Sequence, residues 1–186
     1  CAWGLSLYLN RLSFWLCVAA VPVIVLYPLA KRVFPVPQLV LSIAWGFAVL
    51  ISWTAVTASL QPATGWLWAA TVLWTLGFDT VYAMPDREYD RQVGVNSSAL
   101  FFGDRTPLAV AVFYAAAAAG LARLGMVMAL SLGYWVSWAI ALGLWGLQGW
   151  QLSRRSPSMA DCGRYFRQNV YIGIILLVGM ILGMLL

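Results

Sequence analysis

The sequence predicts an all-α integral membrane protein, and three observations lead to this prediction. Hydrophobic residues make up 63% of the 186 residues, charged residues make up only 9%, and the mean hydropathy is +0.84. This composition excludes an ordinary soluble domain. The few charged residues are separated by long intervals that are continuously apolar, as in membrane helices. The strands of a membrane β-barrel would instead alternate apolar and polar residues.

Six membrane-spanning helices are expected from the uncharged intervals. A helix needs about 20 apolar residues to cross the hydrocarbon core of a bilayer. The interval from 33 to 78 is long enough for two crossings, and residues 59–65 supply the turn because they include serine, proline and glycine. The expected spans form a single transmembrane domain and cover residues 13–29, 37–58, 65–84, 107–122, 131–152 and 169–186.

The first residues of the chain and the positions of its cysteines lead to two further predictions. The chain begins at Cys1, its first methionine is Met84, and residues 1–9 are mostly apolar, like the end of an earlier helix. We therefore expect an N-terminally truncated segment of a longer protein. Cys1, Cys17 and Cys162 lack the spacing of metal ligands, and without histidine this segment contains no histidine metal site and no histidine general base.

The basic residues are distributed unequally between the two sides of the predicted membrane. With six crossings, the loops at 30–36, 85–106 and 153–168 share one side, and the opposite side carries only Arg11 and Arg123 of the 11 basic residues. The positive-inside rule predicts that the three loops are cytoplasmic. We interpret the net charge of +5 as a topology signal and not as a sign of nucleic-acid binding.

A polar strip over residues 79–90 concentrates the carboxylates of the chain, and such clustering in a membrane protein indicates chemistry or ion binding. On a continuous helix, the spacing of Asp79, Asp86 and Asp90 would place the three side chains on one narrow face. Pro85 disfavours a continuous helix, since proline clashes with the preceding turn. The alternative is a span that ends near residue 84, followed by a short helix that begins at Pro85.

Asp86 and Asp90 are the candidate metal ligands. In either arrangement they lie one helical turn apart, about 6 Å along the axis. Two unpaired carboxylates at this separation repel each other unless a cation lies between them. Oxygen ligands without histidine or cysteine favour Mg²⁺. A solvated loop of mixed charge over residues 86–91 would also fit, but it would not account for Asp79, which lies inside an expected span.

These residues resemble the second aspartate-rich motif of the UbiA superfamily of intramembrane aromatic prenyltransferases, and within it the branch of 4-hydroxybenzoate polyprenyltransferases. The residues that carry the resemblance are Phe78, Asp79, Thr80, Tyr82, Ala83, Met84, Asp86, Arg87, Glu88, Asp90 and those at 94–99 and 101–103. Upstream, Tyr27, Pro28, Lys31, Arg32, Pro37, Gln38 and Leu41 are similar to the stretch before the fifth helix of that family. Pro85 and Tyr89 depart from the family pattern, since an acidic residue is common at the latter position.

The resemblance implies a nine-helix bundle with two aspartate-rich motifs on cytoplasmic loops, of which this chain covers the last six helices. The first motif is absent from these residues, so we expect the segment alone to be inactive. The implied reaction is Mg²⁺-dependent transfer of a polyprenyl group from polyprenyl diphosphate to an aromatic acid, with 4-hydroxybenzoate as the expected acceptor. The implied setting is ubiquinone-type or plastoquinone-type quinone biosynthesis in the bacterial inner (plasma) membrane.

The resemblance also implies roles for individual residues. The aspartate pair would hold Mg²⁺, which neutralises the diphosphate of the donor. Lys31 and Arg32, on the same side of the membrane, would bind the donor diphosphate. Asp79 and Tyr82 would orient the acceptor or a metal-bound water. The apolar prenyl tail would lie among the helices within the bilayer.

Two other functions stay open on the residues alone. A CDP-alcohol phosphotransferase also places spaced aspartates at a membrane surface, but its D-G-x-x-A-R element does not occur in this sequence. A non-enzymatic segment of a cation-coupled transporter would use Asp79 as an intramembrane ion site. The clustering of carboxylates at one face of the membrane counts against the transporter.

Overall fold

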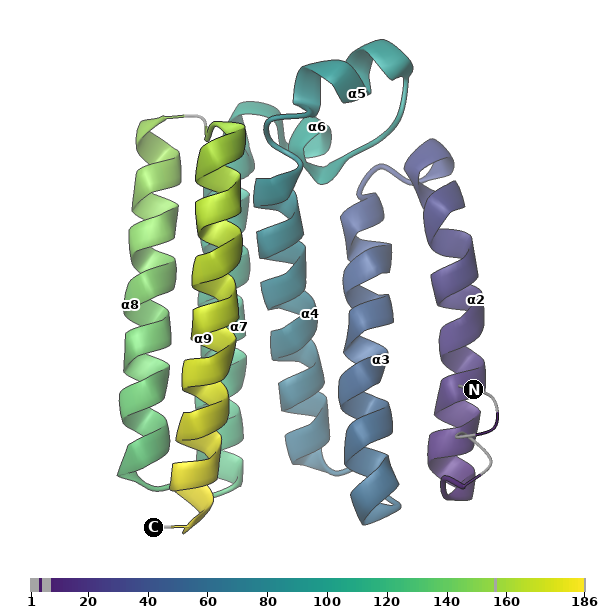
Figure 1. Ribbon diagram of the computed structural model, residues 1–186, viewed down its shortest axis with the longest axis vertical. Coiled ribbons are helices and arrows are strands. Elements are labelled where there is room, and N and C mark those ends of the chain that lie inside the picture. Colours follow the sequence, from purple (N-terminus) through teal and green to yellow (C-terminus); the bar gives the residue numbers. More distant parts are fainter. Residues whose placement is uncertain (1–3, 5–7, 156, 186) are drawn as a thin grey trace.

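The computed structural model describes residues 4, 8–155 and 157–185, so most of the apolar segment 1–9 and residue 186 of the last expected span lie outside the described residues. Within the described part every regular element is helical, which confirms the predicted all-α class. The long helices are α2 (Arg11–Val33), α3 (Pro37–Thr57), α4 (Pro62–Tyr82), α7 (Thr106–Val127), α8 (Leu132–Arg154) and α9 (Met159–Leu185) (Figure 1). The short helices are α5 (Arg87–Val93), α6 (Ser98–Phe102) and the 3₁₀ turn η1 (Gly103–Arg105).

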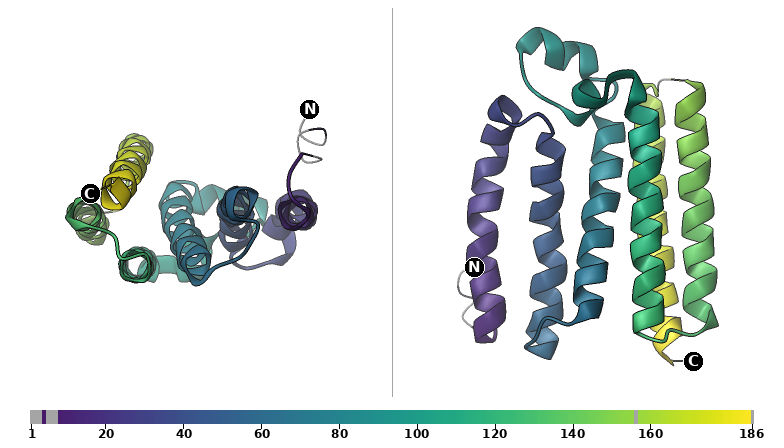
Figure 2. Two further views of the ribbon diagram at one scale, coloured as in Figure 1. Left: turned by 90° about the horizontal axis from the view of Figure 1, so that it is seen from below. Right: turned by 180° about the vertical axis from the view of Figure 1, so that it is seen from behind.

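The long helices run alternately up and down, and each packs against the next one in sequence order (Figure 1). Seen along the helix axes they form an open curve, with α2 at one end and α8 and α9 at the other (Figure 2). Helix α9 also contacts α4. Helices α5 and α6 cover one end of the bundle, while the start of α2 and the end of α9 lie at the opposite end. The acidic strip therefore lies at one end of an apolar bundle.

Among the described residues, four stretches are long and apolar enough to cross a membrane, namely α2, α3, the region Ser98–Val127 and α9. Helices α4 and α8 lie over the expected spans 65–84 and 131–152, but tryptophan in both helices and glutamine in α8 make them less apolar. The structure thus supports an all-helical protein with four candidate membrane-spanning segments. The six crossings stay a prediction.

The last helix begins at Met159, ahead of the expected span at 169, so the expected loop 153–168 is much shorter. Ser158 and Asp161 explain this difference because they exchange hydrogen bonds at the start of α9. The Ser158 N–H donates to Asp161 Oδ2 (3.1 Å), and the Asp161 N–H donates to Ser158 Oγ (3.2 Å). Such a capping box satisfies free N–H groups of the first turn. The helix therefore begins at this box and includes the charged residues that follow it.

Gly77 allows α4 and α7 to approach closely. A Cβ atom at this position would lie 2.7 Å from Cε1 of Tyr114, which is nearer than side chains pack. The Tyr114 ring also stacks on Trp145 of α8, with ring centroids 5.6 Å apart, so it has little room to move. Close helix approach at small residues is a main source of cohesion between membrane helices.

We expect Gly77→Ala to destabilise the bundle by about 1–3 kcal/mol, because the added methyl group overpacks the contact with Tyr114. Thermal unfolding of the detergent-solubilised protein would then shift to lower temperature by several degrees. Gly65→Ala is the matched control on the same helix, since no described atom outside the helix's own nearby backbone lies within 4 Å of the position that its added methyl group would take. Equal melting temperatures for the two variants would contradict the close approach at Gly77.

Candidate functional site

The acidic strip lies at the junction between α4 and α5. Helix α4 ends at Tyr82, and Pro85, which has no N–H to donate, lies in the turn that follows. The second helix begins at Arg87, with Asp86 as its N-cap residue, and not at Pro85 as the sequence suggested. The continuous helix that would align all three aspartates on one face is therefore not formed.

Asp86 and Asp90 nevertheless lie one turn apart, as expected, because the Asp90 N–H donates to the Asp86 carbonyl oxygen (2.8 Å). Two arginines flank the pair but bind elsewhere. Arg87 donates to Asp104 (3.0 Å) and Arg91 to Glu88 (3.0 Å). Among the described residues, neither carboxylate of the pair makes a hydrogen bond or an ion pair. Both carboxylates are thus free to bind a ligand.

The aspartate pair fits a Mg²⁺ ion that takes its other ligands from elsewhere. No group of three or more His, Cys, Asp or Glu residues that could enclose a metal is formed in the described part of the chain. A protein-bound Mg²⁺ usually keeps several waters and uses one or two carboxylates together with substrate phosphates. Two free carboxylates with oxygen donors satisfy that requirement, whereas a zinc site would need nitrogen or sulfur ligands.

Asp79 lies in the last turn of α4 and carries an unsatisfied polar atom. Its Oδ2 is buried and has no hydrogen-bond partner in the described residues. The carboxylate is close enough to interact electrostatically with Tyr27 on α2 and Tyr114 on α7. Buried polar atoms without partners are rare in folded proteins. A bound ligand that donates a hydrogen bond would satisfy this oxygen.

Tyr82, Lys31 and Arg32 are exposed at the same end of the bundle. Tyr82 is the last residue of α4, is 53% exposed, and its hydroxyl makes no hydrogen bond to the described residues. Lys31 and Arg32 form the last turn of α2, and neither makes an ion pair in the described part. The Lys31 carbonyl accepts a hydrogen bond from the Asn96 N–H (2.8 Å), so the loop after α5 is held against the end of α2.

Gln38, Thr80 and Ser98 hold the acidic segment in place, a role that no sequence pattern had indicated. The Ser98 N–H donates to Gln38 Oε1 (2.8 Å), and Thr80 Oγ1 donates to Ser98 Oγ (2.8 Å). All three side chains are buried, so α3, α4 and α6 are joined by a satisfied polar cluster. Gly94 ends α5 in the left-handed conformation (φ 75°), which turns the chain back towards α2.

A second polar cluster crosses the apolar part of the bundle. Asn169 on α9 accepts hydrogen bonds from Nε1 of Trp74 (2.7 Å) and of Trp145 (3.3 Å). The Asn169 amide donates to Gln148 Oε1 on α8 (3.2 Å). The sequence does contain a signal for this cluster, namely asparagine and glutamine within otherwise apolar helices. Such side chains form hydrogen bonds between neighbouring membrane helices. This cluster fixes α9 against α4 and α8.

An apolar pocket of about 310 Å³ lies between α2 and α3. Its lining residues are Ile24, Tyr27, Leu41, Ala44, Trp45 and Ala48. Since Tyr27 also interacts electrostatically with Asp79, this apolar space is near the acidic residues. The site therefore combines free carboxylates and free basic side chains at one end of the bundle with an apolar space beside them.

The model of the UbiA prenyltransferase family matches residues 1–184 of this chain, which is nearly its whole length. The chain belongs to the UbiA prenyltransferase family. This confirms the resemblance found in the acidic strip, and together with the long apolar helices it indicates an integral membrane protein.

The curated relatives of this UbiA family chain are named as 4-hydroxybenzoate polyprenyltransferases. It is 64% identical over 185 residues to a 4-hydroxybenzoate solanesyltransferase of Synechocystis sp., an alignment that covers 100% of this chain and 63% of the relative. It is 39% identical over 179 residues to a 4-hydroxybenzoate octaprenyltransferase of Ralstonia nicotianae, covering 96% of this chain and 60% of the relative. The chain thus spans about three fifths of the length of these relatives.

A solved structure of a UbiA homolog from Aeropyrum pernix K1, in the apo state, has the same fold. The TM-score is 0.77 at 28% sequence identity, and the match covers 97% of this chain and 67% of the other chain. The up-and-down helical arrangement described above is therefore that of a UbiA protein.

Proposed function

We propose that the complete protein transfers a polyprenyl group from polyprenyl diphosphate to 4-hydroxybenzoate in quinone biosynthesis of the ubiquinone or plastoquinone type. The observation that carries this proposal is the set of unpartnered carboxylates of Asp79, Asp86 and Asp90 at one end of an apolar bundle. Relatives named as 4-hydroxybenzoate polyprenyltransferases support the choice of donor and acceptor. Because this chain covers 63% of the Synechocystis relative, the proposal concerns the complete protein.

We further propose that the six long helices are the last six of a nine-helix UbiA-type bundle and form one transmembrane prenyltransferase domain in the bacterial inner membrane. The loops at 30–36, 85–106 and 153–168 would face the cytoplasm. The excess of basic residues in these loops supports this orientation. A cytoplasmic site would also receive its charged donor directly from the cytoplasm.

Asp86 and Asp90 would hold Mg²⁺ through their free carboxylates. When bound, this ion supplies positive charge that neutralises the leaving diphosphate. Lys31, with Arg32 beside it, would donate hydrogen bonds to the diphosphate oxygens and stabilise the negative charge that develops on them. Arg87 would hold η1 in place through Asp104 and the Gly103 carbonyl oxygen (3.1 Å) instead of binding the substrate.

Asp79 and Tyr82 would orient the aromatic acceptor. The unpartnered Oδ2 of Asp79 can accept a hydrogen bond from the phenol hydroxyl, which makes the ring more electron-rich. In the reaction, the bond between the allylic carbon and the diphosphate oxygen breaks. A carbon–carbon bond forms at the ring position ortho to the hydroxyl, and the ring proton at that position is lost. The apolar pocket between α2 and α3 would hold part of the prenyl tail and keep water from the allylic cation.

A transfer assay on the complete protein in membranes tests this function. The protein would receive 4-hydroxybenzoate and a polyprenyl diphosphate, and prenylated product would be measured by mass spectrometry, with and without chelator and added Mg²⁺. We expect product only when both substrates and the metal are present. Product from a CDP-alcohol and a lipid acceptor, with no prenylated product, would establish the phosphotransferase alternative instead.

We expect Lys31→Ala to raise the apparent KM for polyprenyl diphosphate by about tenfold, because one charge-assisted contact to the diphosphate contributes about 1.5–3 kcal/mol. The apparent KM for 4-hydroxybenzoate should change little, and steady-state kinetics with each substrate varied in turn measures both. Arg123→Ala, an exposed basic residue on α7, is the matched control. A selective effect on the aromatic acceptor would contradict the role of Lys31.

The orientation can be tested by labelling of single cysteines with a membrane-impermeant thiol reagent. Cys1, Cys17 and Cys162 would first be replaced by serine. Cysteine at Gln92, exposed on α5, should react only from the cytoplasmic side, and cysteine at Leu60, exposed between α3 and α4, only from the other side. Labelling of both positions from the same side would refute the crossing of α4.

A further inference from the structure

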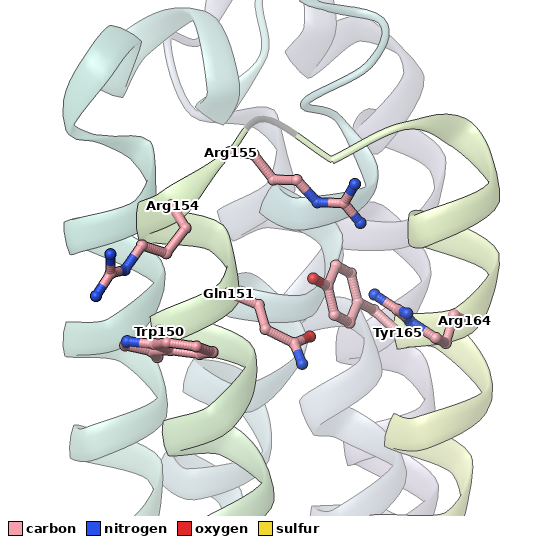
Figure 3. Close-up of a pocket in the computed structure, with 6 residues that line it drawn as sticks. All are labelled: Trp150, Gln151, Arg154, Arg155, Arg164 and Tyr165. Carbon is pink, nitrogen blue, oxygen red and sulfur yellow. The ribbon is translucent and has the colours of Figure 1, made fainter.

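A basic pocket lies between the cytoplasmic ends proposed for α8 and α9, at the same end of the bundle as the acidic strip (Figure 1). It has a volume of about 260 Å³. Its lining residues are Trp150, Gln151, Arg154, Arg155, Arg164 and Tyr165 (Figure 3). Helix α8 and the residue after it supply the first four, and α9 supplies the other two. Nothing in the proposed transfer reaction uses these residues.

The charge of this pocket is positive even after its internal ion pairs are considered. Asp161 is the acidic partner of both Arg155 and Arg164, at 3.1 Å from each. One carboxylate thus serves two guanidinium groups. Arg154 makes no ion pair in the described residues and instead lies over the ring of Trp150, with 5.3 Å between its Cζ and the ring centroid. The pocket can therefore accept an anion.

Two polar groups inside the pocket lack partners. The Tyr165 side chain is largely buried, but its accessible hydroxyl is directed into the space beside Gln151 and makes no hydrogen bond to the described residues (Figure 3). Oε1 of Gln151 is buried and has no partner there either. A hydroxyl can donate to a phosphate oxygen, whereas an amide oxygen needs a donor. A ligand that satisfies both groups would carry an anion and a hydroxyl group.

The surroundings of the pocket are those of a bilayer surface. Trp150 is 56% exposed one turn below Arg154, and tryptophan at this level is typical of the membrane interface. Further from the pocket, both helices expose apolar side chains on the same face as its arginines, namely Leu147, seven residues before Arg154 on α8, and Tyr171, seven residues after Arg164 on α9. A ligand with a charged head and apolar chains would thus meet matching surface along its whole length.

We propose that this pocket binds the headgroup of an anionic glycerophospholipid of the phosphatidylglycerol type. Arg155 and Arg164 bind the phosphate, Arg154 adds positive charge at the edge of the pocket beside Trp150, and the Tyr165 hydroxyl donates to one of the phosphate oxygens. A glycerol hydroxyl of the headgroup donates to Gln151 Oε1, and the acyl chains lie along the exposed apolar faces of the two helices. Basic pockets between membrane helices are suited to such headgroups because the phosphate is only partly screened at the bilayer surface. The proposal does not depend on the transfer reaction.

Native mass spectrometry of the complete, delipidated protein tests this proposal. Phosphatidylglycerol, phosphatidylcholine and phosphatidic acid with identical acyl chains would be added in turn, and inorganic phosphate would be added in a separate arm. We expect one phosphatidylglycerol per chain, bound at least about tenfold more tightly than phosphatidylcholine. The double variant Arg154→Gln, Arg155→Gln should lose this preference, and Arg123→Gln on α7 should keep it.

Gln151→Leu separates the hydroxyl contact from the charge. It should abolish any preference for phosphatidylglycerol over phosphatidic acid, while both still bind more tightly than phosphatidylcholine. Equal binding of phosphatidylcholine, or unchanged binding in the double arginine variant, would refute the site. Displacement of phosphatidylglycerol by millimolar inorganic phosphate would refute the lipid as occupant in favour of a free anion. Melting temperatures of all variants distinguish loss of the site from loss of the fold.

Discussion

Asp86→Ala or Asp90→Ala in the complete protein should lower prenyl transfer by at least about 10²-fold. The physical reason is the loss of one of two oxygen ligands that hold positive charge against the leaving diphosphate, an interaction that strengthens as the bond breaks. Stability should change little, because neither carboxylate makes a hydrogen bond or an ion pair in the described residues. Turnover would be measured at saturating donor and acceptor over a range of Mg²⁺ concentrations.

Glu88→Ala is the matched control for these two variants. Glu88 lies on the same short helix and is exposed, and its only partner in the described part is Arg91 at 3.0 Å. A surface ion pair of this kind contributes little to stability. We therefore expect near-normal transfer by Glu88→Ala. Near-normal transfer by both aspartate variants would overturn the assignment of the metal ligands.

Asp79→Asn should lower kcat by about 10²-fold without lowering the melting temperature. The amide keeps the shape of the side chain but removes the charge that would hold and activate the acceptor. Loss of a general acid–base or orienting group lowers the rate by a factor of this size. An aspartate with a structural role would behave differently, since loss of its hydrogen bonds would destabilise the protein. Here the buried Oδ2 has no hydrogen bond to lose among the described residues.

Kinetics and thermal unfolding of the same preparation together test the role of Asp79. Asp104→Asn serves as a control, because the Asp104 side chain is fully exposed and its pairing with Arg87 is at the surface. That variant should retain transfer. If Asp79→Asn retained normal kcat, or lost activity only in proportion to a lower melting temperature, then Asp79 would be a structural residue and not a group that acts on the acceptor.

The all-α class and the approximate positions of the long helices could be predicted because they follow from composition and local charge. Long uncharged intervals between Arg11 and Leu185 can satisfy their backbone hydrogen bonds in a bilayer only as helices or closed barrels. The start of α9 could not be predicted from hydropathy, although Ser158 and Asp161 have the spacing of a capping box. The end of α4 was predicted within a few residues from Pro85, because proline acts locally.

Membership of the UbiA family and the one-turn spacing of Asp86 and Asp90 could also be predicted from the sequence. Both follow from residues that are close together along the chain. Which carboxylates are free could not be predicted. Arg87 and Arg91 are adjacent to the aspartate pair in sequence, yet they bind Asp104 and Glu88. Arg87 reaches Asp104 because η1 lies beside the start of α5, and this placement depends on tertiary packing.

The sequence by itself therefore determined a helical membrane protein with most of its acidic residues in one strip, because helix formation in a bilayer and charge placement are local properties. Only the tertiary structure decided which side chains join that strip to the bundle. Gln38, Thr80 and Ser98 come from three helices and meet in a buried polar cluster. The pocket between α8 and α9 likewise forms only when arginines of both helices pack together around Asp161. Such contacts depend on helix packing angles and on close approach at small residues, which no local pattern specifies.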